Sequence, residues 1–359
     1  MKEKKDKEKF INKYINTYSP VGLENAGQLV WLNEMKKYVD SKTRDSYGNA
    51  IATLVGKTEL KNRPSVVLEA HADEISWIIT QVQDDGFIRV TTHGGSDNMI
   101  APSMDVVIHT FDNKQVPGVF GWSAVHTRST RVVEGPAVDE LWIDCGFSDK
   151  EEASRNGVKP GCIVTFDTKL KEMGDYYVGK SLDNKIGGYI LTQVAKRIKK
   201  ENLEFFFDVV FVNAVQEEVG LYGATMLAKK LNPTLALVHD VCHASDTPGM
   251  NKAKIGDIKC GKGPLISYTA QNHRKLNGMF IDIAEDEGIP YQVGVGSYGN
   301  DTMPFFKEGI PTNIISSPLR YMHTTVEMVH KKDVESAIRL YVEVLKNITP
   351  EYIANVYTP

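Results

Sequence analysis

An apolar segment in the middle of the chain, Phe205–Val215, stops shortly before two adjacent acids, Glu217 and Glu218. The segment shows little alternation of apolar and polar positions, which is typical of a strand covered on both faces by helices. Beyond Gly220 the apolar residues recur every three or four positions, the spacing of a helix. The two acids are therefore predicted to lie where a buried strand leads into a helix, at the sheet edge where α/β proteins bind ligands.

The same pattern recurs along much of the chain. Further short apolar strands are predicted at residues 65–70, 235–238 and 312–316. Helical spacing of apolar residues predicts further helices at 10–18, 29–39, 186–198 and 333–345. These elements predict an α/β fold with a mixed, mostly parallel sheet that carries helices on both faces.

Residues 75–174 have a different pattern, in which short apolar runs such as 106–108 and 162–166 are separated by Gly, Pro, Asp and Asn. Short strands without helices predict a small β-barrel or sandwich. Because α/β patterns occur on both sides of this region, we expect an insertion. The predicted domains are an α/β domain made of residues 1–74 and 175–359, and an inserted β-barrel of residues 75–174.

The composition narrows the classes of function. A chain of 359 residues with 42% hydrophobic content can bury a sizeable core in more than one domain. The formal net charge of −4 argues against nucleic-acid binding, which needs a basic surface. The Lys-rich start, Met1–Lys9, lacks the apolar core of a signal peptide, and no run reaches the roughly 18 apolar residues of a membrane span. We therefore expect a cytoplasmic protein without membrane contact, whose four cysteines are free thiols.

Acids and histidines follow the predicted strands of the α/β domain or precede its helices. These residues are His71 and Asp73, Asp183, Glu217 and Glu218, Asp240, and His323. Each one alone is more often a cap, turn or surface residue, but one shared metal site explains their common position better than separate accidents. Imidazole and carboxylate without thiolate suit Zn²⁺, Co²⁺ or Mn²⁺ in an open catalytic site. Two histidines and several carboxylates are more ligands than one ion needs, so we expect two ions about 3.5–4 Å apart.

The motifs around these residues resemble those of the M42 metallo-aminopeptidases, which include glutamyl and deblocking aminopeptidases. The matching stretches are EAHADEI around His71, SLDNKIGG around Asp183, AVQEEVGLYGA around Glu217, HDV at Asp240 and SPLRYMHTTVEMV around His323. In the inserted region, GVKPGCIVTFD is similar to the barrel of that family. The resemblance covers nearly the whole chain and implies a dinuclear metal-dependent enzyme that removes N-terminal residues from peptides.

The resemblance also implies how the ligands are divided between the ions. Asp183 would bridge the two ions. One ion would also be held by His71 and Asp240, and the other by Glu218 and His323.

Catalytic and assembly roles follow from the same resemblance. Glu217 would be the general base, and Asp73 would orient the imidazole of His71. The family also forms large hollow homo-oligomers, commonly dodecamers, to which the inserted barrel contributes contacts. The implied partners are therefore peptide substrates and further copies of the chain.

Other functions remain open at this point. Paired carboxylates also serve metal-independent glycoside hydrolases of the endoglucanase kind, although the histidines would then have no role. A non-catalytic assembly protein that keeps its metals for structure is a third possibility, and a carboxypeptidase or deacylase is a fourth. The sequence does not specify the preferred N-terminal residue. Arg274, Arg320 and Lys262 could favour acidic substrates, but each is more often a solvated surface charge.

Overall fold

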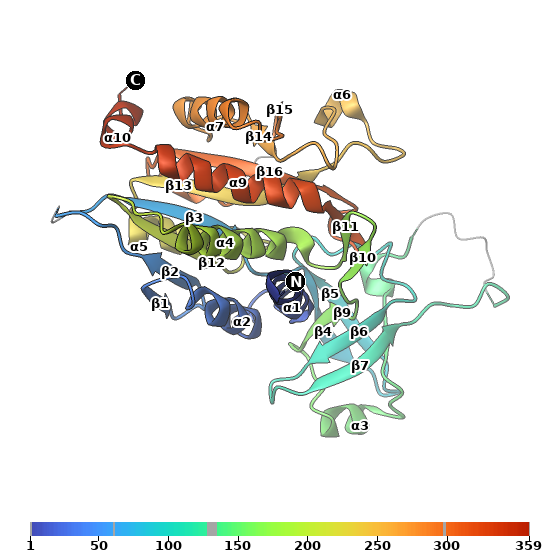
Figure 1. Cartoon of the computed structure of the whole chain (residues 1–359). Helices are drawn as coiled ribbons and strands as arrows, with labels where there is room; N and C mark the ends of the chain where they lie inside the picture. Colours follow the sequence, from blue (N-terminus) through green and yellow to red (C-terminus); the bar gives the residue numbers. More distant parts are fainter. Residues whose placement is uncertain (1, 60–61, 128–134, 297–298, 359) are drawn as a thin grey trace.

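The computed structural model describes residues 2–59, 62–127, 135–296 and 299–358. Within these residues, eleven strands belong to one large mixed sheet and six others form a closed barrel. Figure 1 shows helices packed along the sheet and the barrel projecting from one of its ends. The mixed α/β sheet and the inserted antiparallel barrel confirm the predicted fold class.

The elements of the α/β part lie on both sides of the barrel in the sequence. Its strands are β1 (Ser41–Arg44), β2 (Ala50–Leu54), β3 (Ser65–His71), β10 (Lys171–Met173), β11 (Tyr176–Gly179), β12 (Asp208–Ala214), β13 (Leu235–His243), β14 (Leu265–Ser267), β15 (Gln292–Gly294), β16 (Thr312–Arg320) and β17 (Glu327–His330). Its helices are α1 (Lys2–Asn16), α2 (Asn25–Met35), α4 (Leu182–Glu201), α5 (Tyr222–Leu231), α6 (Lys252–Ile255), α7 (Arg274–Asp286), α8 (Thr302–Lys307), α9 (Lys331–Asn347) and α10 (Pro350–Val356).

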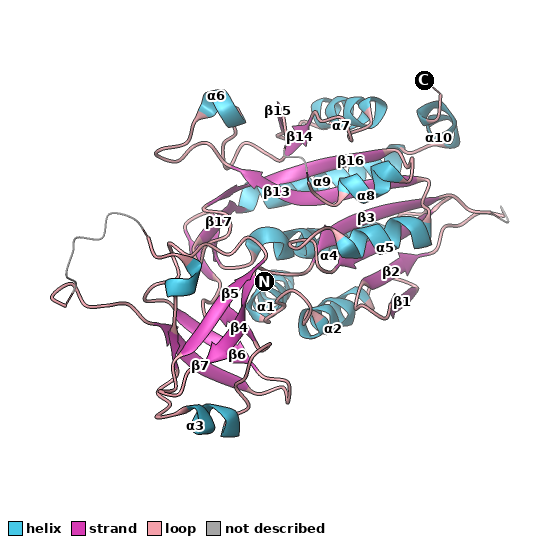
Figure 2. Ribbon diagram, turned by 180° about the vertical axis from the view of Figure 1, so that it is seen from behind, coloured by secondary structure: helices cyan, strands magenta, loops and turns pink. Residues whose placement is uncertain are grey.

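The main path of the sheet has the strand order β1-β2-β12-β3-β13-β16-β17-β11-β10. Parallel pairs join its four central strands, β12, β3, β13 and β16, whereas the strands on either side pair antiparallel. Figures 1 and 2 show α4 and α9 on one face of these strands and α5 and α8 on the other. The carboxyl ends of the central strands therefore share one edge.

The central strand β12 shows why the apolar pattern does not alternate. Val209 and Phe211 pack in the core cluster that includes α4, whereas Val210 and Val212 pack in the cluster that includes α5. Both faces of the strand are thus covered, as predicted. The strand begins at Asp208, later than the apolar segment itself.

The barrel consists of β4 (Ser76–Val82), β5 (Ile88–His93), β6 (Asp105–His109), β7 (Gln115–Phe120), β8 (Ile143–Asp144) and β9 (Ile163–Phe166). Its core centres on Trp77, whose ring meets Phe120 and Phe166 edge-on. The expectation that this region has no helix was wrong, because α3 (Lys150–Arg155) lies between β8 and β9. The Asp149 carboxylate caps α3 by accepting a hydrogen bond from the Glu152 amide.

Two further sequence expectations concern cysteines and membrane spans. All four cysteines are free, and Cys162 and Cys242 are buried. No helix in the described part of the chain is long and apolar enough to cross a membrane.

Candidate metal centre

Side chains from the ends of the four central strands and from the start of α4 meet at one sheet edge. His71 Nε2 lies 3.1 Å from Asp183 Oδ1 and 3.8 Å from Asp240 Oδ1. His323 Nε2 lies 3.3 Å from Asp183 Oδ2 and 3.3 Å from Glu218 Oε1. The two oxygens of Asp183 therefore face different histidines, and Asp183 stands between the two halves of the cluster.

An acid just before a helix is commonly its N-cap, but Asp183 does not cap α4. The backbone of Asp183 and Asn184 is not helical, and Asn184 caps the regular part of α4 because its Oδ1 accepts a hydrogen bond of 3.2 Å from the Gly187 amide. The Asp183 carboxylate turns instead toward the two histidines. Burial alone would raise the pKa of Asp183, but the two histidines hold it below its ordinary value.

Asp73 connects the end of β3 to the loop that carries the two glutamates. Its Oδ1 accepts a hydrogen bond of 3.0 Å from the Glu217 amide, and its Oδ2 accepts one of 3.1 Å from the Glu218 amide. The same carboxylate lies 3.5 Å from His71 Nδ1, which is longer than an ordinary hydrogen bond. Asp73 is fully buried. Its closest contacts therefore position the glutamate loop at least as much as the imidazole.

Glu327 was not identified from the sequence, yet it joins two members of the cluster. Its Oε2 accepts a hydrogen bond of 3.1 Å from the Asp183 amide, and its Oε1 accepts one of 2.8 Å from the His323 amide. The side chain is buried, and burial raises its pKa well above the ordinary value. The only sequence signal is its place in the motif that follows His323.

The barrel also contributes to this edge of the sheet. The carbonyl oxygen of Gly95 lies 3.1 Å from His323 Nδ1, and because a carbonyl can only accept, Nδ1 donates to it. This bond leaves Nε2 directed at the carboxylates. A Cβ atom on Gly95 would lie 2.5 Å from His323 Nδ1, so the close approach requires glycine.

The cluster holds more negative charge than its protein surroundings stabilise. Burial raises the pKa of Glu217 to about 10 and that of Asp240 to about 7, and neighbouring carboxylates add to both shifts. Burial alone would lower the pKa of His323, but Asp183 and Glu218 raise it to about 11. Such a site favours cations strongly.

The donor set fits divalent metal ions. Three overlapping groups have ligand atoms within 4.8 Å of one another. They are His71 with Asp183 and Asp240, Asp183 with Glu218 and His323, and His71 with Glu217 and Glu218. Two imidazoles with carboxylates and no thiolate suit Zn²⁺, Co²⁺ or Mn²⁺. The orientation of His323 by a backbone carbonyl is the arrangement that ligating histidines need.

A cavity of about 470 Å³ opens onto the cluster. Among the predicted site residues, six line it, namely His71, Asp183, Glu217, Glu218, Asp240 and His323. Asp73 lies behind them and is fully buried. The volume suits the end of a peptide or another small ligand.

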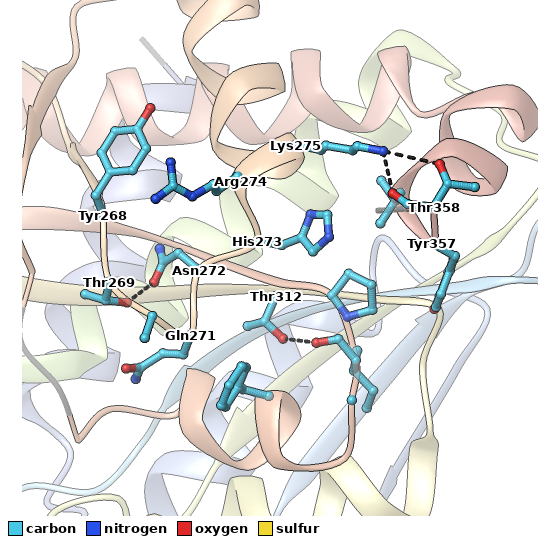
Figure 3. Close-up of a pocket in the computed structure, with 16 residues that line it drawn as sticks. Tyr268, Thr269, Gln271, Asn272, His273, Arg274, Lys275, Thr312, Tyr357 and Thr358 are labelled. Carbon is cyan, nitrogen blue, oxygen red and sulfur yellow. Dashed lines mark hydrogen bonds between the residues drawn. The ribbon is translucent and has the colours of Figure 1, made fainter.

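A larger cavity of about 920 Å³ lies at the start of β16, where Thr312, His273 and Arg274 line it (Figure 3). The described residues that line it include none of the predicted site residues. Arg274, one of the three cations proposed for acidic substrates, belongs to this second cavity. Arg320 is paired with Asp246 at 2.6 and 3.0 Å.

Comparison with known proteins agrees with this geometry. The sequence profile of the M42 glutamyl aminopeptidases matches residues 48–340. The lysyl aminopeptidase of Pyrococcus furiosus is 29% identical over 352 residues, which is 95% of this chain and 97% of that protein. The solved aminopeptidase APDkam598 from Desulfurococcus kamchatkensis is 31% identical with a TM-score of 0.89, over 99% of this chain and 98% of that one.

A second solved structure, the TET1 peptidase of Pyrococcus horikoshii, is 30% identical with a TM-score of 0.84, over 95% of this chain and all of that one. That peptidase can assemble into a tetrahedron or a large octahedral shell. Fold, cluster and sequence agree on an enzyme that removes N-terminal residues with the help of metal ions. The chain belongs to the M42 family and is a metallo-aminopeptidase.

Proposed function

We propose that this aminopeptidase works with two divalent ions, Zn²⁺, Co²⁺ or Mn²⁺, and that Glu217 is its general base. The observation that carries the proposal is the position of Asp183, which belongs to two ligand groups at once. Asp183 would bridge the ions, with His71 and Asp240 on one side and Glu218 and His323 on the other. This division follows the distances from the Nε2 atom of each histidine to its two nearest carboxylates.

The metal ions, when bound, supply Lewis acidity toward the scissile carbonyl and the attacking water. Two observations support Glu217 as the base: it lines the cavity with Oε2 4.0 Å from His71 Nε2, and it belongs to neither of the two ligand groups that share Asp183. Glu217 would be ionised for this step once two bound cations offset the burial that raises its pKa. It would then take one proton from the water as the C–O bond forms. It would then give that proton to the leaving amine nitrogen as the C–N bond breaks.

Asp73 would hold this base in place. Its carboxylate accepts hydrogen bonds from the backbone N–H groups of Glu217 and Glu218, and these bonds fix the backbone that carries the two glutamates. The two glutamates can then have separate roles, one directed at metal and one at the substrate. The central position of both histidines gives no support to a glycoside hydrolase, which would leave them without a role.

We also propose that the chain assembles into a closed homo-oligomer, a dodecamer by analogy with its relatives. The support is the assembly of the TET1 peptidase and a related solved structure that contains a dodecamer. Light scattering of the intact protein at low micromolar concentration should give the mass of many chains. A monomer under those conditions would contradict the proposal.

Chelation tests the metal dependence. Treatment with a strong chelator followed by dialysis should abolish cleavage of aminoacyl p-nitroanilides, and adding Co²⁺, Zn²⁺ or Mn²⁺ should restore it. Metal analysis of the restored enzyme should give two ions per chain. The substitution Asp183→Ala should reduce occupancy at both positions. Full activity of the metal-free protein would refute the assignment.

A further inference from the structure

The walls of the 470 Å³ cavity outside the metal cluster carry no charge among the described residues. The titratable acids and histidines that line the cavity are the six members of the proposed catalytic cluster. Five other side chains are apolar or contain sulfur. They are Leu221, Val241, Cys242, Ile314 and Met322. Ser267, Ser316, Asn300 and three glycines complete the described walls.

The apolar residues adjoin the proposed ligands in the sequence and in space. Val241 and Cys242 follow Asp240 on β13, and Met322 precedes His323. Cys242 packs in a small apolar cluster with Ile258 and Leu265, so further apolar residues lie behind this side of the cavity. The side chain of a peptide residue held at the cluster would therefore lie against apolar groups.

We infer that the site accepts peptides whose N-terminal side chain is uncharged and mainly apolar. The inference rests on the proposed function and names its substrate class. A buried charge without a partner is costly, so a Glu or Lys side chain would lose much of its binding free energy in such walls. Apolar side chains gain about 25 cal/mol per Å² of buried surface instead.

The cations that could have attracted an acidic substrate are placed elsewhere. Arg320 donates two hydrogen bonds to Asp246, and its guanidinium lies 5.1 Å from the centre of the Tyr176 ring. Arg274 lines the second cavity, and Lys262 lines neither cavity. The matching family profile is that of glutamyl aminopeptidases, whereas the Pyrococcus furiosus relative is a lysyl aminopeptidase. In this chain, the walls of the 470 Å³ cavity outside the metal cluster favour neither an acidic nor a basic side chain.

A substrate panel on the metal-loaded enzyme tests the inference. The substrates are the p-nitroanilides of Leu, Met, Glu and Lys, with acetyl-Leu p-nitroanilide as a control for the free amine. We expect kcat/KM for Leu or Met to exceed that for Glu and Lys by at least about tenfold. Highest activity with Glu or Lys would overturn the inference while the proposed function stands. No cleavage of any substrate would overturn the proposed function itself.

A charge placed in the wall tests the same point by a second route. Met322→Lys and Leu221→Lys each put an ammonium group in the cavity, and each should raise the ratio of kcat/KM for Glu over Leu by about tenfold. Val326→Lys is the matched control, because Val326 is 45% exposed and does not line the cavity. Metal content is measured on all three variants. If the ratio of both cavity variants equals that of the control, these walls do not determine the preference.

Discussion

The buried carboxylate of Glu74 provides a sharp test of how the site is held together. The side chain is 3% exposed and accepts hydrogen bonds from the Ser19 amide at 2.7 Å and from Lys185 Nζ at 3.3 Å. It also accepts from Lys180 Nζ and from Ser181 Oγ. These contacts join the end of β3, which carries His71, to the start of α4, which carries Asp183, and to the loop after α1.

Replacing Glu74 by Gln keeps the shape but leaves the two buried ammonium groups without a counter-charge. Removing one partner of a buried ion pair typically costs about 3–5 kcal/mol. For a chain of 359 residues that cost corresponds to a fall of about 4–7 °C in the unfolding midpoint. The control is Glu204→Gln, because the Glu204–Lys57 pair is more than half exposed on both sides and is worth at most about 1 kcal/mol.

Urea and thermal unfolding of the metal-loaded variants at pH 7 measure this difference. We expect Glu74→Gln to be far less stable than Glu204→Gln. The double variant Glu74→Gln/Lys180→Met should recover part of the loss, because it removes one of the two uncompensated charges. Equal stability of Glu74→Gln and Glu204→Gln would refute the reasoning, because the buried ammonium groups of Lys180 and Lys185 would then not require the Glu74 carboxylate.

Three further outcomes follow from contacts at the same sheet edge. Asp73→Asn should lower kcat by about 10–100-fold with an unchanged circular dichroism spectrum, because the two glutamate N–H groups donate to different oxygens of Asp73 and the NH2 group that replaces one of them cannot accept; unchanged kcat would exclude this role. Glu327→Gln should weaken metal binding by about 10–100-fold in a chelator competition, since Glu327 holds the backbone of two proposed ligands. Burial alone would raise the pKa of Glu74, but Lys180 and Lys185 hold it below its ordinary value. Its contribution to stability is therefore complete above pH of about 5 and is lost as the pH falls below about 4.5, so the urea midpoint of Glu74→Gln should fall less in that range than that of the wild type.

The sequence predicted the sheet well where burial alone determines the pattern. The strand β12 is apolar on both faces because helices cover both, and this pattern is visible without any tertiary contact. The strand β13 was predicted to end at Val238 but continues to His243. Its apolar run is interrupted by His239 and Asp240, yet its ladder with β16 continues as far as the pair His243 and Leu319. Polar residues within a buried strand therefore concealed its true length.

The supporting contacts of the site could not be predicted because they join distant segments. Glu74 directly follows Asp73 in its motif, and Glu327 is the single acid in the motif around His323. Only the fold shows which backbone segments each of them holds. Gly95 belongs to the barrel, yet it contacts His323 of the α/β part. The proposed ligands could be named from the sequence because each follows a predicted strand or precedes a predicted helix. Their individual roles stay predictions.

The central claim is that Glu217 moves the proton while Glu218 holds metal. The most direct measurement is the metal content and turnover of Glu217→Gln and Glu218→Gln across a metal titration. Glu217→Gln should keep two ions per chain and lose about 10²–10⁴-fold in kcat at every metal concentration. Glu218→Gln should lose metal first and regain part of its activity with excess metal, since an amide oxygen is a weaker ligand. Rescue of Glu217→Gln by metal, or full metal content in Glu218→Gln, would contradict the account.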